Sequence, residues 1–488
     1  MILPLKLKWL PFYALAEGQK AVVGDRVRVT LAGKEYSGIV YKTFPTPERL
    51  EMADKDLTRL SEVLYLEDAP AVSKEELKLW EFLSTYYMCT LGEVFRLAAP
   101  KAAAKGNKTL PLTEIPKRPS LSDREKSAVS RILDSFQAGK PALLCAGDER
   151  EGIFQELSRR TLESGRDVLV LRPELKDSDG PLRYDSKSTA ATKREIRKMI
   201  QAHPGQIVYG TRTAVFLPWK TLGLVIIDDE YSREYKQDSA SPRYNTRDTA
   251  VFLGSVHCAD VLLCATVPSM ESYYNCKVGR YSEVSLPSRE SLVPEIIDTA
   301  DLKRKRGMDG AFSKNLLVRM GMEFENGGKV LLLQPWKDTS DAEIEARTHF
   351  PKVGARLNSM PLWKADSQTL AKYSLTVLMN ADFMLSRQDF RADEKAYREL
   401  VRLKSGCNSL IIQTSVADHP VFGMQNPMDK ILAERKAFNL PPFTREIRIS
   451  DKKGSRSEFL PKDKTLTRKK AALMETLGSD AVIDVDPK

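Results

Sequence analysis

The sequence predicts an α/β protein with two doubly wound parallel-sheet lobes, a small β-rich domain before them and a short unit after them. Short apolar runs alternate with segments of helical periodicity through residues 121–290, and the same alternation returns through 291–445. This pattern is typical of parallel sheets with helices on both faces. A chain of 488 residues is long enough for each unit to bury its own core.

Residues 1–100 are expected to form the β-rich domain. Segments 22–29 and 37–41 alternate apolar and polar residues and are separated by a turn at 32–34, which predicts a hairpin or small barrel. A third short strand is expected at 63–66. A helix follows with apolar residues at helical spacing; it runs from about Ser73 to Tyr87 and includes Leu77, Trp80 and Leu83.

A linker rich in Lys, Ala, Pro and Thr is predicted at 101–120. The first lobe, 121–290, then opens with a helix in which Ser122 is the expected N-cap and Glu125 its capping-box partner. The strands predicted in this lobe are 141–147, 167–171, 206–210, 222–227 and 260–266, and those of the second lobe are 329–333, 375–379 and 409–413.

The last unit, 446–488, is short and basic. Eight basic residues face three acidic ones between 451 and 470. The whole chain carries a formal charge of +10, with a pI near 9.1, which favours an anionic partner such as nucleic acid. A basic run is more often a solvated face, so both interpretations of this segment stay open.

Cysteine usage points to a reducing compartment. The six cysteines include no C-x-x-C pair, which argues against a zinc ribbon and against a disulfide framework and favours the cytoplasm. Four histidines leave little for metal binding, so no metal site is expected. No apolar run approaches the roughly 18 residues of a membrane span, so no membrane partner is expected either.

The stretch 222–231 is a buried strand that ends in three acids, Asp228, Asp229 and Glu230. In open α/β sheets the ligand crevice lies beyond the carboxyl ends of the strands, and acids there suit Mg²⁺-nucleotide chemistry. Acids that cap a following helix or face water are the alternative.

The loop after the first strand of this lobe argues against ATP binding. A phosphate loop needs glycines and a lysine that neutralises the phosphates. Between Gly147 and Gly152 the chain instead has three carboxylates, no lysine and a single arginine, Arg150. Two unit charges about 4 Å apart interact by roughly 4 kcal/mol at an effective dielectric of 20, so these acids would oppose a triphosphate.

Several segments together resemble one known family. They are 210–216 (Gly-Thr-Arg-Thr-Ala-Val-Phe), 222–231, 235–237, 242–248 (Pro-Arg-Tyr-Asn-Thr-Arg-Asp), 268–272 (Pro-Ser-Met-Glu-Ser), 86–94, 380–382, 389–392, 412–414, 418–420, 440–443 and 483–487. The chain is similar in these segments to the PriA family of primosomal replication-restart helicases, which belong to helicase superfamily 2. The resemblance implies two RecA-like lobes, an N-terminal domain that binds DNA 3′ ends, and ATP-driven helicase activity.

The chain departs from the family at the catalytic positions, so the resemblance is to a degenerate member. The phosphate-loop lysine is missing, the family's Asp-Glu-Glu-His reads Asp-Asp-Glu-Tyr at 228–231, and its arginine pair has no counterpart at 403–407. Losing one methylene from the second acid moves a carboxylate by more than about 1 Å, which matters where geometry sets the rate. The winged helix and the cysteine-rich zinc module have no counterpart, so no zinc is expected.

Four residues are the candidate DNA contacts: Tyr13, Arg26, Arg28 and Arg212. In the family's 3′-end pocket Tyr13 is retained while Phe12 stands where the family has aspartate; an aromatic there can still stack on a base. Each candidate has an ordinary alternative, because strand arginines usually face solvent and Arg212 could pair with a core carboxylate.

The leading hypothesis is a DNA-binding protein of replication restart and primosome assembly, without ATPase activity or cofactor. Its expected partners are DNA, forked or with a 3′ end, and replication-restart proteins. An active ATP-dependent 3′–5′ DNA helicase, which would need ATP and Mg²⁺, is the first alternative. A protein-interaction scaffold that does not bind DNA is the second.

Overall fold

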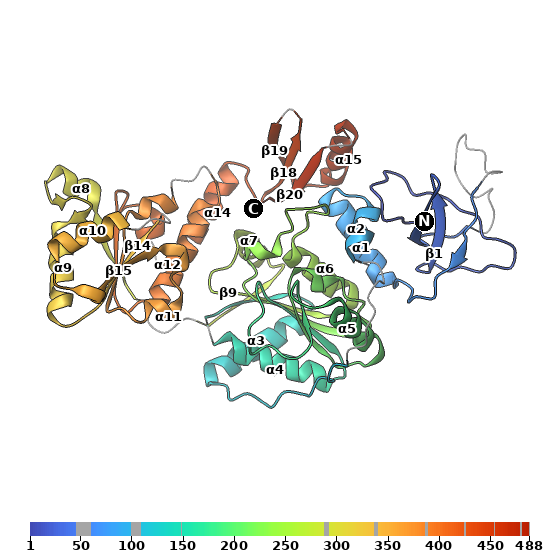
Figure 1. Cartoon of the computed structure of the whole chain (residues 1–488), viewed down its shortest axis with the longest axis horizontal. Helices are drawn as coiled ribbons and strands as arrows, with labels where there is room; N and C mark the ends of the chain where they lie inside the picture. Colours follow the sequence, from blue (N-terminus) through green and yellow to red (C-terminus); the bar gives the residue numbers. More distant parts are fainter. Residues whose placement is uncertain are drawn as a thin grey trace.

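The computed structural model describes residues 1–44, 60–98, 109–147, 149–286, 292–335, 340–385, 389–423, 426–452, 454–478 and 481–487. Figure 1 shows four units: the N-terminal domain, lobe 1, lobe 2 at the opposite end of the molecule, and a C-terminal unit above lobe 1. The mixed α/β class with two parallel sheets agrees with the prediction.

The N-terminal domain holds a three-stranded antiparallel sheet of order β2-β1-β3, formed by β1 (Arg26–Leu31), β2 (Lys34–Ile39) and β3 (Tyr65–Leu66). The β1–β2 turn consists of Ala32 and Gly33, both with positive φ, 51° and 73°. This is the geometry of a two-residue hairpin loop matched to strand twist. Val27 and Val29 are buried between half-buried neighbours, as the alternation predicted.

Two helices complete this domain, α1 (Lys74–Tyr87) and α2 (Leu91–Ala98). Ser73 and Glu76 form a capping box at the start of α1, and its predicted apolar residues are buried. The second helix was not predicted. Phe82 of α1 stacks on Phe252 of lobe 1 with 4.0 Å between ring centroids, so helix α1 joins the domain to that lobe.

Lobe 1 contains a seven-stranded parallel sheet of order β10-β4-β9-β8-β5-β7-β6. Its strands are β4 (Ala142–Cys145), β5 (Asp167–Leu171), β6 (Arg183–Tyr184), β7 (Ile207–Gly210), β8 (Leu222–Ile227), β9 (Asp260–Ala265) and β10 (Ser282–Ser285). Its helices are α3 (Asp123–Gln137), α4 (Arg150–Glu163), α5 (Ala190–Ala202), α6 (Thr246–His257) and α7 (Met270–Lys277).

The centre of this sheet is β8, in which every residue is buried. Val225 and Ile227 pack into the core on one face, and Leu224 and Ile226 pack into the core on the other. The sheet is therefore covered on both sides, which explains the continuous apolar run. The predicted capping box of Ser122 and Glu125 is confirmed at the start of α3.

The described part of the predicted linker, 109–120, has no regular structure but docks on lobe 1. Thr113 exchanges two hydrogen bonds with the start of β7: its amide donates to Gln206 Oε1 at 3.0 Å, and its hydroxyl accepts from the Ile207 amide at 3.0 Å. Residues 101–108 lie outside the described residues.

Lobe 2 contains a five-stranded parallel sheet of order β11-β17-β16-β14-β15. Its strands are β11 (Glu295–Asp298), β14 (Val330–Gln334), β15 (Leu357–Pro361), β16 (Leu375–Leu378) and β17 (Leu410–Thr414), with a small hairpin of β12 (Met308–Asp309) and β13 (Phe312–Ser313). Its helices are α8 (Thr299–Arg304), α9 (Lys314–Glu325), α10 (Ser340–His349), α11 (Ser367–Leu370), α12 (Ala392–Gly406), α13 (Pro420–Gly423) and α14 (Met428–Ala437).

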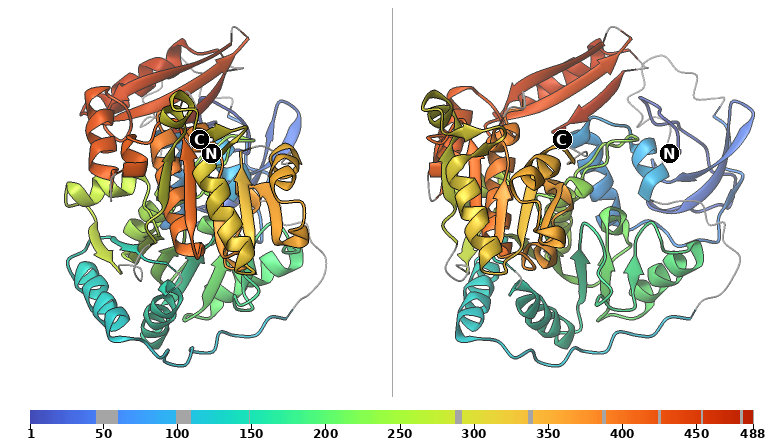
Figure 2. Two further views of the ribbon diagram at one scale, coloured as in Figure 1. Left: turned by 90° about the vertical axis from the view of Figure 1, so that its left-hand side faces the viewer. Right: turned by 60° about the vertical axis from the view of Figure 1, so that its left-hand side comes forward.

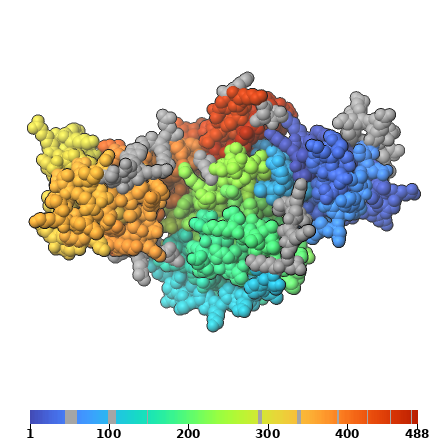
Figure 3. Space-filling model, in the orientation of Figure 1, coloured from blue at the N-terminus to red at the C-terminus, as the bar shows by residue number. Residues whose placement is uncertain are grey.

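The C-terminal unit is a three-stranded antiparallel sheet of order β19-β18-β20 with one helix. It comprises β18 (Thr444–Asp451), β19 (Gly454–Pro461), α15 (Leu466–Thr476) and β20 (Val482–Val485). Figures 2 and 3 show this unit at the top of the molecule, between lobe 2 and the N-terminal domain. Among the described residues, no helix has the length and apolarity needed to cross a bilayer.

Candidate functional site

The three acids after β8 lie at the carboxyl edge of lobe 1, but they do not form one cluster. Asp228 and Glu230 are buried, and Asp229 is partly exposed with a left-handed φ of 48°. The reversal at Asp229 sends the neighbouring carboxylates to different partners. Asp228 and Asp229 meet arginines, whereas Glu230 turns toward the segment 268–272.

Arg150 lies against the two aspartates. It is the first residue of α4, and its Nε lies 3.0 Å from Asp228 Oδ1 while its Nη1 lies 3.1 Å from Asp229 Oδ1. Burial raises the pKa of Asp229, and Arg150 opposes this rise. The single arginine of the loop thus neutralises the acids at the strand end; Asp148 of that loop lies outside the described residues.

Arg172 is the second partner of Asp228, and it was not singled out from the sequence. Its guanidinium donates to Asp228 Oδ2 at 2.5 Å, to Asp179 Oδ1 at 2.9 Å and to Glu151 Oε1 at 2.7 Å. Its side chain is only 1% exposed. Burial would lower its pKa, but the three carboxylates raise it above the ordinary value. A signal was present: Arg172 directly follows β5, the neighbour of β8, so it emerges at the same edge.

Glu230 fixes a turn of the backbone rather than facing the other acids. Its carboxylate accepts hydrogen bonds from the Ser269 amide at 2.6 Å, the Ser269 hydroxyl at 2.9 Å and the Ser272 hydroxyl at 3.0 Å. Arg247 adds an ion pair at 3.2 Å. The third acid therefore ties the 268–272 segment, at the start of α7, to β8.

The two lobes meet through Glu394 of α12. Its carboxylate accepts from Arg435 Nη2 at 2.7 Å and from Arg398 Nη2 at 2.8 Å within lobe 2, and from the Met270 amide of lobe 1 at 3.3 Å. Arg398 also lies over the ring of Tyr231, 4.0 Å from its centroid. Tyr231, which stands where the family has histidine, is therefore covered by a lobe 2 guanidinium.

A second interlobe carboxylate, Glu271, is surrounded by cations. Burial would raise its pKa, but Arg247, Arg391, Arg435 and Lys462 bring it down to about 2. These cations come from lobe 1, lobe 2 and the C-terminal unit. Glu271 therefore remains ionised through the physiological range, and Arg247 Nη1 lies 3.9 Å from its Oε2.

The three candidate DNA contacts of the N-terminal domain all have partners within the protein. The Tyr13 hydroxyl donates to the Thr30 carbonyl at 3.0 Å, Arg26 Nε donates to the Pro70 carbonyl at 3.2 Å, and Arg28 pairs with Glu67 at 2.8 Å. Arg26 and Arg28 share one face of β1, both half-buried. Burial and the nearby Arg197 lower the pKa of Arg26.

Arg212, the fourth candidate, lies in lobe 1 and bonds to backbone. Its Nη1 donates to the Glu234 and Lys236 carbonyls, each at 3.2 Å. It pairs with no core carboxylate in the described structure, contrary to the alternative considered from the sequence. It holds the loop after β8, and the structure does not bring it together with the N-terminal candidates through any described contact.

In the basic run of the C-terminal unit, some side chains face solvent and others form contacts within the protein. Arg456 is about half exposed, whereas Lys470 is buried and donates to the Thr85 carbonyl at 2.7 Å and to the Tyr86 carbonyl, near the end of α1. Burial lowers the pKa of Lys470 to about 8. At least one lysine of this run therefore stabilises an interdomain contact.

Residues 484–486 add further contacts between the C-terminal unit, lobe 1 and α1. Lys236 of lobe 1 pairs with Asp484 of β20 at 2.7 Å and donates to the Val485 carbonyl at 2.6 Å. Arg445 of β18 pairs with Asp486 and lies over the Tyr86 ring. Strand β20 therefore links the C-terminal sheet to both lobe 1 and α1.

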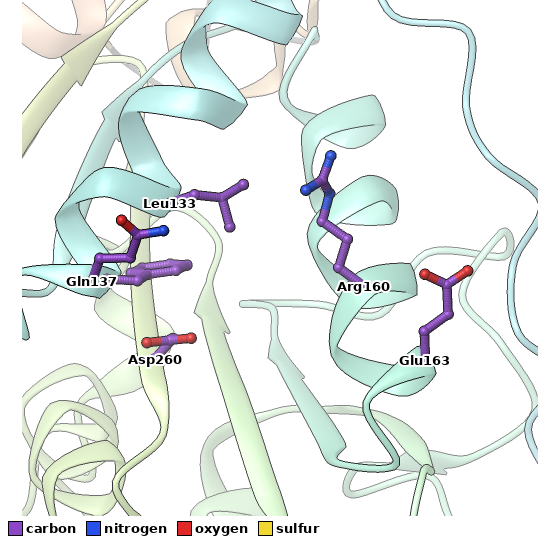
Figure 4. Close-up of a pocket in the computed structure, with 6 residues that line it drawn as sticks. Leu133, Gln137, Arg160, Glu163 and Asp260 are labelled. Carbon is purple, nitrogen blue, oxygen red and sulfur yellow. The ribbon is translucent and has the colours of Figure 1, made fainter.

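A surface hollow of about 570 Å³ lies at the other edge of the lobe 1 sheet, between α3 and α4. Figure 4 shows Leu133 and Gln137 on one side, Arg160 and Glu163 on the other, and Asp260 at the start of β9. Because the strands are parallel, this amino edge is opposite the one that carries Asp228. The hollow therefore takes no part in the site described above.

Comparison with known proteins relates the chain to one family. Residues 1–100 match the family model of the PriA 3′DNA-binding domain. The replication restart protein PriA of Rickettsia felis is 33% identical over 347 residues, which are 66% of this chain and 51% of that protein. The chain is similar to PriA. The PriA of Rickettsia conorii is 30% identical over 68% of this chain and 52% of its own length, and that of Helicobacter pylori is 28% identical over 60% and 47%.

The chain spans about half the length of the PriA proteins it matches. Among solved structures, RecG bound to a three-way DNA junction aligns with 82% of this chain and 56% of its own at 12% identity, with a TM-score of 0.40. A DEAD box protein from Methanococcus jannaschii aligns with 66% of this chain and 96% of its own at 12% identity, with a TM-score of 0.35.

The PriA match places three of the four candidate DNA contacts in one domain. Tyr13, Arg26 and Arg28 fall within the 3′DNA-binding domain, whereas Arg212 lies outside it. The expected resemblance to PriA is therefore confirmed.

Proposed function

We propose that this PriA relative is a DNA-binding protein of replication restart that does not bind or hydrolyse ATP. It binds forked DNA or DNA with a 3′ end, and it acts in primosome assembly with other restart proteins. The observation that carries the proposal is the pairing of Asp228 with both Arg150 and Arg172 at the edge of lobe 1 where a nucleotide would bind.

The residues at this edge do not fit a Mg²⁺-nucleotide. A nucleotide would need a loop whose amides and lysine hold the phosphates, and an aspartate free to hold Mg²⁺, usually through water. Here Arg150 lies beside one oxygen of Asp228 and Arg172 donates to the other. Mg²⁺ would have to displace a guanidinium from a buried carboxylate, which leaves a buried charge without its partner.

Among the described residues of lobe 2, the guanidinium that lies over Tyr231 at this edge is already engaged in contacts within the protein. Arg398, the lobe 2 guanidinium that reaches lobe 1 here, lies on the Tyr231 ring and pairs with Glu394. It also donates hydrogen bonds to the Val267 carbonyl at 3.3 Å and to the Pro268 carbonyl at 3.4 Å. These contacts join the two lobes directly.

Support for DNA binding comes from the N-terminal domain and from charge. Residues 1–100 match the family model of the PriA 3′DNA-binding domain, and the chain carries ten excess positive charges, which favour a polyanionic partner. The six free cysteines suit a reducing compartment, so we place this function in the cytoplasm.

The double substitution Arg26→Ala/Arg28→Ala is expected to weaken binding of forked DNA. If each arginine neutralises one phosphate, the slope of log K against log salt should fall in magnitude by up to about 2, because each contact contributes roughly 0.9. Fluorescence anisotropy of a labelled fork with a free 3′ end, measured over a salt series, checks this.

The matched control is Lys303→Ala/Arg304→Ala, which removes the same charge from exposed positions in lobe 2. Equal effects of the two double variants would show that only net charge matters and would refute the assignment to β1. Absence of DNA binding by the unmodified protein would favour the scaffold hypothesis, and ATP-dependent unwinding would favour the helicase.

A further inference from the structure

We propose that Trp363 and Lys364 of lobe 2 form a platform on which one nucleobase of single-stranded DNA stacks. The inference rests on the proposed DNA-binding function and adds a second contact, in a different unit from the 3′DNA-binding domain. The two residues lie in the short 3₁₀ turn Leu362–Lys364, which directly follows β15.

The turn holds its backbone rigidly while it exposes the indole. Leu362 and Ala365, on either side of the pair, are buried in the core of lobe 2. Arg402 of α12 donates to the Leu362 carbonyl at 3.3 Å and to the Ala365 carbonyl. Between these anchors the Trp363 side chain is 62% exposed. A large aromatic surface is therefore presented in a fixed position without being used for packing.

The neighbouring lysine supplies the charge that a nucleic acid contact needs. Lys364 Nζ lies 5.3 Å from the centroid of the Trp363 ring, at its face. Single-stranded nucleic acids are commonly bound by aromatic rings that stack on bases, with cations beside them for the backbone. The ammonium can leave the ring for a phosphate, since an exposed cation–π contact is worth only about 0.5–1 kcal/mol.

The platform lies at the rim of the junction between the lobes. Arg398 and Arg402 are four residues apart on α12 and so share one face of the helix, about one turn apart. Arg398 contacts Val267 of lobe 1 and Tyr231, and Arg402 contacts the platform turn. Trp363 also follows the carboxyl end of β15, the edge at which open α/β sheets bind ligands.

A base carried by DNA fits this place better than a free nucleotide does. Any nucleobase can stack on an indole, but a mononucleotide triphosphate also needs a cradle for several negative charges. In lobe 1 the loop that would provide it is occupied by the Arg150 ion pairs with Asp228 and Asp229. Lys364 alone suits one backbone phosphate.

The test is binding of a labelled oligothymidylate by the full chain carrying Trp363→Ala, Trp363→Phe or Lys364→Ala. Loss of one stacked base should weaken binding about 5- to 150-fold, and Trp363→Phe should recover most of it because a phenyl ring also stacks. Lys364→Ala should lower the salt slope by about 0.7. The control is Phe438→Ala, another exposed aromatic, 74% exposed, which should bind as the unmodified chain does.

Photocrosslinking gives a readout that a structural role would not move. An oligonucleotide carrying 5-iodouracil should crosslink to the peptide that contains Trp363. Unchanged affinity of Trp363→Ala, with crosslinks elsewhere, would overturn the platform while leaving DNA binding by the N-terminal domain intact. Displacement of the oligonucleotide by millimolar ATP, dependent on Trp363, would overturn it in favour of a mononucleotide. Absence of any DNA binding by the unmodified chain would overturn the proposed function itself.

Discussion

Replacing Arg172 by methionine is expected to lower the free energy of unfolding by about 3–5 kcal/mol, the usual cost of removing one partner from a buried ion pair. Methionine keeps much of the volume but none of the charge. Asp228 would lose the hydrogen bond to Oδ2, and Asp179, also buried, would lose its guanidinium. Because both carboxylates are shielded from water, solvent cannot replace the bonds that are lost.

Chemical denaturation followed by far-UV circular dichroism measures this effect. Lys187→Met is the matched control: Lys187 pairs with Glu174 at 3.3 Å, but both side chains are about 80% exposed, so its removal should change stability by less than about 1 kcal/mol. Adding Asp228→Asn to Arg172→Met should recover part of the loss, since one uncompensated charge is removed. Equal effects of the Arg172 and Lys187 variants would mean that the buried network adds no stability.

Replacing Glu394 by alanine is expected to cost about 2–5 kcal/mol and to uncouple the two lobes. The substitution leaves the Arg435 guanidinium, which is 2% exposed, without its carboxylate and also frees Arg398 and the Met270 amide. Because this carboxylate bonds to both lobes, the loss falls on their interface as well as on α12.

Differential scanning calorimetry should show the cooperative transition of the unmodified chain broaden or split when Glu394 is removed. Glu399→Ala is the control, because Glu399 lies on the same helix and pairs with Arg402 at a partly exposed site. That variant should keep the original shape of the transition. A Glu394→Ala protein that melts like the control would show that other contacts hold the lobes together.

Strands and helix starts were predictable from local sequence. The all-apolar run of β8 requires burial on both faces, and Ser122 with Glu125 defines a helix start through a capping box that forms within four residues. The hairpin of β1 and β2 followed from alternation and from Gly33 at its turn. These features depend on neighbours in the chain, so the sequence contains them.

The partners of the acidic residues were not predictable in the same way. Asp228, Asp229 and Glu230 are adjacent in sequence, yet the positive φ of Asp229 directs them to different partners. Glu230 bonds to Ser269, 39 residues away, and Asp228 pairs with Arg172, 56 residues away, and with Arg150, which lies still farther along the chain. No local pattern around Lys470 predicted its hydrogen bond to the Thr85 carbonyl near the end of α1. Such pairings depend on which strands are neighbours in the sheet and on how the units dock.

We propose that Arg150 and Arg172 occupy the acids that would otherwise serve a nucleotide. The decisive measurement is ATP hydrolysis by the full chain with Mg²⁺ and a saturating concentration of forked DNA. We expect phosphate release no faster than from a matched Asp228→Asn preparation, with or without DNA. DNA-stimulated hydrolysis by the unmodified chain that disappears in Asp228→Asn would contradict it.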